Sequence, residues 1–357
     1  MNFDDLLRLA VTEGASDLHI TSGSHPMLRS SGTLYPISGQ PVLKPGDIEE
    51  SLRHLLDKTR WEIFQRDREL DFSYAIPGLS RVRINASFER GNISLSCRLL
   101  PFKILSLDEL GLPQLCKELV AKPRGMILVT GPTGTGKSTT LAAMINYMNE
   151  NLNKRIITIE DPIEFVYENK KSIIMQRELG TDTLSFQAAL KHVLRQDPNV
   201  ILIGELRDMD TISVALTAAE TGHLVLSTLH TVNAAQTVDR IVDVFPASNQ
   251  QQIRLQLSLV LEGVISQVLL PRADGKGRIA AFEIMAANYA IRNLIREGKS
   301  FQIPNFLQMG KQQGMQTLDQ ALEELVKAKL ITPQTALSKA IHAEELAQAL
   351  KRSSSLD

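Results

Sequence analysis

The chain has 357 residues, 43% of them hydrophobic and 22% charged, which is typical of an ordinary globular protein long enough for two domain cores. Its 39 lysines and arginines nearly balance its 40 aspartates and glutamates, so net charge gives no reason to expect a general nucleic-acid binder, although a local basic patch stays open. The two cysteines, Cys97 and Cys116, lie far apart without CxxC partners, so neither a disulfide framework nor a zinc ribbon is indicated.

Residues 1–100 predict a small α+β domain with a sheet. The opening "NFDDLLRLAVTEG" is typical of an amphipathic helix, and "SDLHIT" alternates as a strand does. The runs "ELDFSYAIPG", "SRVRINASFERG" and "NISLSCRLLP" then predict an antiparallel meander. Its turn signals lie at Pro77-Gly78 and Gly91-Asn92.

Residues 101–113 are the expected linker, because prolines stand at both ends of a stretch that mixes loop with one short helical piece. From residue 126 onward, the β-rich runs "MILVT", "RIITIE", "VILIGE" and "HLVLSTLH" are separated by stretches long enough for crossover helices. This pattern predicts an α/β fold with a parallel sheet, assigned to residues 114–285.

The longest apolar stretch, "LQLSLVLEGVISQVLL" at 255–270, predicts a buried helix. It is no membrane span because polar residues interrupt it, namely Gln256, Ser258, Glu262, Ser266 and Gln267. The N-terminus shows no apolar core of the signal type, so we expect a cytoplasmic protein that could still dock on a membrane complex.

The final residues, 286–357, are expected to form a helical region. Thr317 and Gln320 fit a capping box that opens one helix. Thr332-Pro333 starts another, with proline at its first position.

The segment "GPTGTGKS" follows a predicted strand and opens a predicted helix, the context expected of a P-loop. Its N–H groups would cradle the β- and γ-phosphates of ATP, Lys137 would add a positive charge, and Ser138 would offer its hydroxyl to Mg²⁺. The predicted nucleotide-binding residues are Gly131, Pro132, Thr133, Gly134, Thr135, Gly136, Lys137, Ser138 and Thr139.

Two acidic positions follow strands at the same predicted sheet edge, where parallel sheets bind ligands. Glu160 ends "RIITIE", while "VILI" is followed by Gly204 and Glu205 where P-loop proteins commonly place an aspartate. We expect one of Glu160 and Glu205 to act on the metal through water and the other to polarise the attacking water. Glu160 is favoured for the attacking water and Glu205 for the metal, although the sequence leaves this division open.

His230 ends a third strand at this edge, where a donor could sense the γ-phosphate. His223 lies at the opposite end of that strand, where a structural role is as well supported as a functional one.

In order and spacing, "GPTGTGKST", "IITIEDPIEF", "DPNVILIGELRD" and "GHLVLSTLHT" resemble the Walker A, Asp box, atypical Walker B and His box of the secretion ATPase superfamily. The resemblance implies a RecA-like P-loop ATPase core, a smaller N-terminal PAS-like domain and a homohexameric ring. Gly204 and Glu205 fit that family's own pattern.

The chain resembles the retraction branch of the type IV pilus motors, because "AIRNLIRE" at 290–297 is similar to that branch's signature. Two isolated cysteines cannot form the four-cysteine zinc insertion of the extension and type II secretion branches. In this helix Ile291, Leu294 and Ile295 would form a buried face. Arg292 and Arg296 would meet acidic or polar groups, with an ordinary solvated helix as the alternative.

The resemblance also implies arginines that stabilise the transferring phosphate. Arg83 and Arg98 would lie on adjacent strands for this role, and plain surface charge is the competing explanation. It further implies a cytoplasmic protein at the inner face of the cytoplasmic membrane, with no span of its own. Expected partners are an inner-membrane pilus platform protein of PilC-like type and a paralogous retraction ATPase, with no nucleic acid.

Two other functions stay open. A nucleic-acid motor would share the P-loop and the ring, but it should show a basic stripe or stacking aromatics, and aromatic residues make up only 5% of the chain. A regulator that binds ATP without hydrolysis would keep Lys137 but could lose the acids. The presence of Glu160 and Glu205 argues against it.

Overall fold

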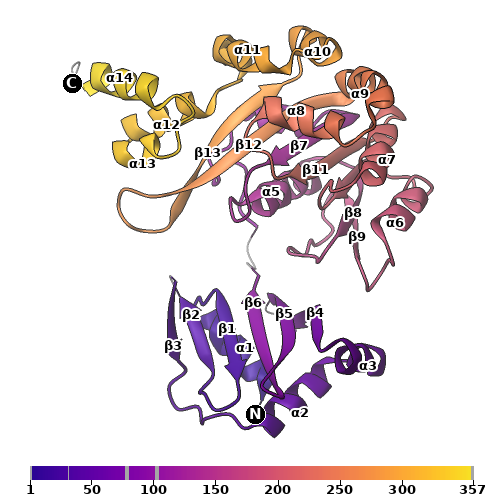
Figure 1. Cartoon of the computed structure of the whole chain (residues 1–357), viewed down its shortest axis with the longest axis vertical. Coiled ribbons are helices and arrows are strands. Elements are labelled where there is room, and N and C mark those ends of the chain that lie inside the picture. The colour runs from indigo at the N-terminus through magenta and orange to yellow at the C-terminus, as the bar shows by residue number, and fades with distance from the viewer. Residues whose placement is uncertain (1, 31, 77–79, 101–103, 355–357) are drawn as a thin grey trace. The chain divides into compact units, whose positions relative to one another are not determined.

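The computed structural model describes residues 2–30, 32–76, 80–100 and 104–354 (Figure 1). The chain divides into two compact units, the first comprising Met1–Ile104 with Pro162–Val166 and the second Leu105–Asp161 with Tyr167–Asp357. The predicted turn at Pro77-Gly78 and the first three residues of the predicted linker lie outside the described residues.

The first unit is an antiparallel sheet with helices. Its elements are α1 (Phe3–Thr12), β1 (Asp17–Thr21), β2 (Met27–Ser30), β3 (Thr33–Pro36), α2 (Pro45–Leu55), α3 (Lys58–Asp67), β4 (Glu69–Ile76), β5 (Ser80–Glu89) and β6 (Asn92–Leu99). The strand order is β3-β2-β1-β6-β5-β4, so the predicted meander is confirmed. Helix α1 begins after Asn2, whose side chain accepts from the N–H groups of Asp4 and Asp5, and it buries its apolar face against the sheet.

The second unit is built on a mixed sheet in the order β13-β12-β7-β11-β10-β8-β9. Its strands are β7 (Gly125–Thr130), β8 (Arg155–Glu160), β9 (Ile173–Glu178), β10 (Val200–Ile203), β11 (Leu224–Leu229), β12 (Leu261–Pro271) and β13 (Arg278–Ala286). All neighbours pair in parallel except β12 and β13. The four β-rich runs predicted to form a parallel sheet are therefore confirmed.

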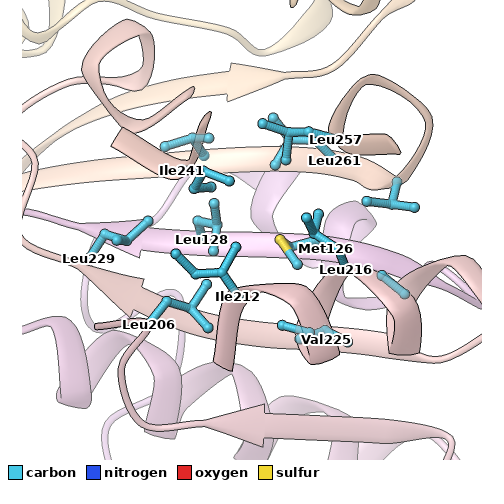
Figure 2. Close-up of a cluster of buried hydrophobic side chains, with 14 of the residues drawn as sticks. Met126, Leu128, Leu206, Ile212, Leu216, Val225, Leu229, Ile241, Leu257 and Leu261 are labelled. Carbon is cyan, nitrogen blue, oxygen red and sulfur yellow. The ribbon is translucent and has the colours of Figure 1, made fainter. Parts of the chain in front are cut away.

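Helices cover both faces of this sheet. They are α4 (Gln114–Val120), α5 (Lys137–Asn151), α6 (Phe186–Val193), α7 (Met209–Glu220), α8 (Ala234–Asp243) and α9 (Ala247–Val260). Met126 and Leu128 of β7 pack with residues of α7, α8 and α9 (Figure 2). The alternating Ile127 and Val129 pack with α5 on the other face. Burial of each such side chain contributes about 1.5–3 kcal/mol to the stability of the fold. The packed core therefore holds the strands, and the residues at their ends, in fixed positions.

The predicted helix at 255–270 is wrong in its second half. Helix α9 ends at Val260, and β12 begins at the next residue and pairs with β7 on one side and β13 on the other. A buried central strand and a buried helix both read as apolar runs, so periodicity alone does not separate them. The β-branched residues Val264 and Ile265 favour the strand.

The C-terminal region is helical, as expected. It contains α10 (Tyr289–Arg296), η1 (Ser300–Gln302), α11 (Ile303–Met309), η2 (Gly310–Gln313), α12 (Leu318–Lys327), α13 (Pro333–Leu337) and α14 (Ala343–Ser354). The capping box of Thr317 and Gln320 is confirmed, and so is the helix that starts with Pro333. Over the described ranges, no helix is long and apolar enough to cross a membrane.

Helix α10 buries Ile291, Leu294 and Ile295, which confirms the predicted apolar face. Arg292 donates to the carboxylate of Glu262 at 2.8 Å and to the carbonyl oxygens at the end of α9. Its expected acidic and polar partners therefore lie within the chain itself.

Candidate active site

The loop from Gly131 to Gly136 joins the end of β7 to the first residue of α5. Gly131 and Gly136 have φ angles of +141° and +90°, in the left-handed region that favours glycine. Gly136 is the N-cap of α5 and brings no capping side chain, so the first N–H groups of this helix can serve a phosphate. The predicted P-loop context of strand, loop and helix is therefore present.

The ammonium of Lys137 is held at the loop. Its Nζ donates to the carbonyl oxygens of Gly131 at 2.7 Å and Pro132 at 3.0 Å. The hydroxyl of Thr135 donates to the same Pro132 oxygen at 2.9 Å. These bonds hold the loop in a curve around the ammonium group of Lys137. They keep its positive charge at the place where a phosphate would bind.

Three predicted residues lie at the carboxyl edge of the sheet, beside the P-loop. His230 follows β11, the neighbour of β7, while Glu205 follows β10 and Glu160 ends β8, the next two strands in the order. Because neighbouring strands lie about 4.8 Å apart, the strands that carry Glu205 and Glu160 run about 10 Å and about 14 Å from β7. Of the three residues, His230 therefore follows the strand that lies nearest to β7.

Gly204 lies beside the end of β8, within ordinary van der Waals contact. A Cβ atom built there would lie 3.4 Å from the carbonyl oxygen of Ile159 and 3.6 Å from the Cα of Glu160. An aspartate at 204 would therefore point toward the backbone of β8. The next position, Glu205, carries the carboxylate of this strand end instead.

Both oxygens of Glu205 have cationic or potentially cationic partners. Oε1 lies 3.1 Å from Nε2 of His230, and Oε2 lies 3.0 Å from Nε of Arg207. These three side chains also line a pocket of about 410 Å³, together with Leu206, Leu229, Thr231 and Arg240.

Glu160 has a different set of partners. Its Oε1 accepts from the hydroxyl of Thr158 at 2.6 Å and from the amide of Gln176 at 3.2 Å. Both donors fix the direction of the carboxylate, which suits a group that must orient a water molecule. The sequence analysis missed Arg207 and Gln176. Arg207 stands two residues beyond Glu205 and could have been found, whereas Gln176 lies on β9 without any motif.

Arg83 and Arg98 belong to the first unit, and they face each other in register on β5 and β6. Arg98 bonds to Asp17 at 3.1 Å, while Arg83 lies 4.0 Å from Asp71. In the second unit, His223 lies at the opposite end of β11 from His230 and donates to the carbonyl oxygen of Ala218 at 3.0 Å.

Comparison with known proteins gives consistent results. Residues 92–338 match the family described as type II/IV secretion system proteins. The chain is 50% identical over 321 residues to a twitching motility protein of Neisseria gonorrhoeae, covering 90% of this chain and 86% of that protein. It is 47% identical over 340 residues to the type IV pilus retraction ATPase PilT of Pseudomonas aeruginosa, covering 95% and 98%. A crystal structure of the pilus retraction motor PilT with bound ADP superposes with a TM-score of 0.91 at 44% identity, covering 98% of this chain and 99% of that one.

Proposed function

The chain belongs to the family of type II/IV secretion system proteins, and we propose that it is a hexameric motor whose ATP hydrolysis powers the retraction of type IV pili and hence twitching motility. It is an ATPase with a RecA-like α/β fold, and the predicted membership of the secretion ATPase superfamily is confirmed. The observation that carries the proposal is a likeness to a pilus retraction motor along almost the whole chain, C-terminal helices included.

The P-loop supplies the nucleotide site. Its N–H groups and the start of α5 would bind the β- and γ-phosphates of ATP, and Lys137, which now donates to two loop carbonyl oxygens, would donate to phosphate oxygens instead. Gly131 to Thr139 are the proposed binding residues.

The oxygen atoms beside the P-loop fit Mg²⁺. Within the described part of the chain, no group of three or more His, Cys, Asp or Glu side chains could hold a metal ion. In nucleotide sites, however, Mg²⁺ takes one or two protein ligands together with phosphate oxygens and water. Ser138 would hold it directly and Glu205 through water. The bound ion would neutralise charge that develops on the phosphates.

The remaining polar side chains divide the other roles. Glu160, oriented by Thr158 and Gln176, would polarise the attacking water. His230 would sense the γ-phosphate and, through its contact with Glu205, relay that state to the acid. Arg83 and Arg98 would stabilise the charge of the transferring phosphate in the assembled ring.

ATP binding would draw the two units together, and hydrolysis with phosphate loss would release them. This cycle would displace an inner-membrane platform protein at the base of the pilus. The proposed site of action is therefore the cytoplasmic face of the membrane, with a paralogous retraction ATPase as a further partner.

The test combines phosphate release with retraction. The purified chain should form a ring in ATP and release phosphate when Mg²⁺ is present, and its gene should restore twitching to a strain without its retraction motor. Lys137→Ala should fail in both assays. A wild type that forms a ring and binds ATP yet releases no phosphate would overturn the motor. Salt-sensitive binding to DNA that stimulates turnover would favour a nucleic-acid motor instead.

A further inference from the structure

Gln267 is a buried polar residue on β12 that lies directly against the P-loop, far from it in sequence. Its side-chain amide donates to the carbonyl oxygen of Thr135 at 2.6 Å. Its side-chain oxygen accepts from the hydroxyl of Thr140 at 2.8 Å. Only 2% of Gln267 is exposed, so both bonds are shielded from water.

These two bonds join different parts of the phosphate site. Thr135 lies in the loop itself, while Thr140 lies in the first turn of α5. A single side chain therefore ties the loop to the helix whose N-terminus faces the phosphates.

The two loop glycines with positive φ angles, Gly131 and Gly136, also pack against residue 267. A Cβ on Gly131 would lie 2.4 Å from the backbone oxygen of Gln267, and a Cβ on Gly136 would lie 3.2 Å from its side-chain nitrogen. The register explains this proximity, because Ser266 pairs with Thr130 at the last position of β7. Gln267, the residue after Ser266, is therefore in contact with the backbone of the loop.

A P-loop turns N–H groups toward the ligand, so some of its carbonyl groups must face the protein. A buried carbonyl group without a donor is costly, because it loses its bonds to water. Of the side chains that could fill this place, an amide offers a donor and an acceptor at once. Glutamate would lose the donor, and methionine would lose both.

We propose that Gln267 is a positioning residue of the nucleotide site, which holds the P-loop in the curvature that directs its N–H groups at the phosphates of ADP and ATP. This inference rests on the proposed function only in taking a nucleotide as the ligand. Gln267 touches no reacting atom and acts through Thr135 and Thr140.

The test is ADP affinity, measured by calorimetry on the full chain. Gln267→Met preserves the volume of the side chain and removes both bonds, and ADP should bind about tenfold more weakly. The KM for ATP should rise by a similar factor, with a smaller change in kcat.

Gln316→Met is the matched control, since the side chain of Gln316 also donates to a backbone carbonyl, that of Phe282, at 2.8 Å. It should leave ADP affinity unchanged. Thr140→Val removes only a hydroxyl, and its effect should shrink when combined with Gln267→Met, because the two groups share one bond.

A folded Gln267→Met protein that binds ADP within twofold of wild type would overturn the inference. If that variant does not fold, an ADP affinity of Thr140→Val equal to that of wild type would overturn it. Failure of the wild type to restore twitching would instead count against the proposed function and leave the role of Gln267 standing.

Discussion

Nε2 of His230 lies 3.1 Å from Oε1 of Glu205, so the side chains that follow the neighbouring strands β11 and β10 form one contact. The other oxygen of Glu205 is held by Arg207. A γ-phosphate that attracted His230 would therefore loosen one of the two restraints on Glu205. The contact gives a physical route by which phosphate binding changes the position of an acid.

The first prediction concerns His230. We expect His230→Ala to lower kcat by about 10- to 100-fold, the effect of losing a hydrogen bond to a charged group, while ADP affinity stays close to that of wild type. Steady-state phosphate release and ADP titration check this. His223→Ala, at the other end of the same strand, is the control. Equal losses in the two variants would remove the phosphate-sensing role of His230.

The second prediction separates the two acids. Glu160→Gln should lower kcat by about 10²–10⁴-fold without changing the Mg²⁺ concentration needed for half-maximal rate, because this carboxylate would act on water. Glu205→Gln should raise that Mg²⁺ concentration as well as lower kcat. Titrating Mg²⁺ against phosphate release checks both. Glu168→Gln, on an exposed residue of the following loop, is the control. If only Glu160→Gln raised the Mg²⁺ concentration needed for half-maximal rate, Glu160 would act on the metal and Glu205 on the attacking water.

The sequence predicted the parts of the site that are local. The P-loop is a run of consecutive residues, and the acids and His230 each stand at the end of an apolar run, so motif and strand pattern were enough to bring them to one edge. The spacing of Arg207 from Glu205 is equally local and could have been used.

The missed parts depend on strand pairing. Gln176 reaches Glu160 because β9 pairs with β8, and Gln267 reaches the P-loop because β12 pairs with β7. Both pairs are parallel, so no hairpin turn in the sequence marks these strands as neighbours. The contact of Gln267 with the P-loop was also missed because residues 255–270 were predicted to be a helix, which would not place Gln267 on a strand beside β7.

The third prediction concerns the arginines of the first unit. If Arg98 stabilises the transferring phosphate, Arg98→Ala should lower kcat by ~10³-fold or more with the oligomer intact. Arg83→Ala should behave alike. Arg29→Ala is the matched control, because Arg29 also lies near Asp17, at 3.9 Å, but on β2. Phosphate release beside light scattering measures both properties. If the Arg83 and Arg98 variants turn over as fast as Arg29→Ala, neither arginine acts on the phosphate, and both are ordinary charged residues of the surface.

The last prediction concerns Glu283 on β13, which is 4% exposed and accepts from the N–H of Ala234, the first residue of α8, at 2.7 Å. Burial, with a smaller contribution from Asp319, raises the pKa of Glu283 from 4.5 to about 7. Between these values the folded chain binds more protons than the unfolded chain does. The stability from this group is therefore full below pH 4.5 and is lost as the pH rises through about 7.

Glu283→Gln keeps the acceptor for Ala234 and abolishes the titration. Between pH 5 and pH 8 the wild type should lose up to about 3 kcal/mol more free energy of unfolding than this variant, as measured by urea denaturation. Glu324→Gln, on an exposed partner of Lys311, should follow the wild type because its carboxylate is solvated. Ala234 stands four residues after His230, so the loop between them should also become less stable as the pH rises. Its amide hydrogens should then exchange faster with solvent, which hydrogen exchange can measure. Parallel pH profiles for wild type and Glu283→Gln would show that Glu283 is already ionised at pH 5 in the folded chain, and burial would then not govern its titration.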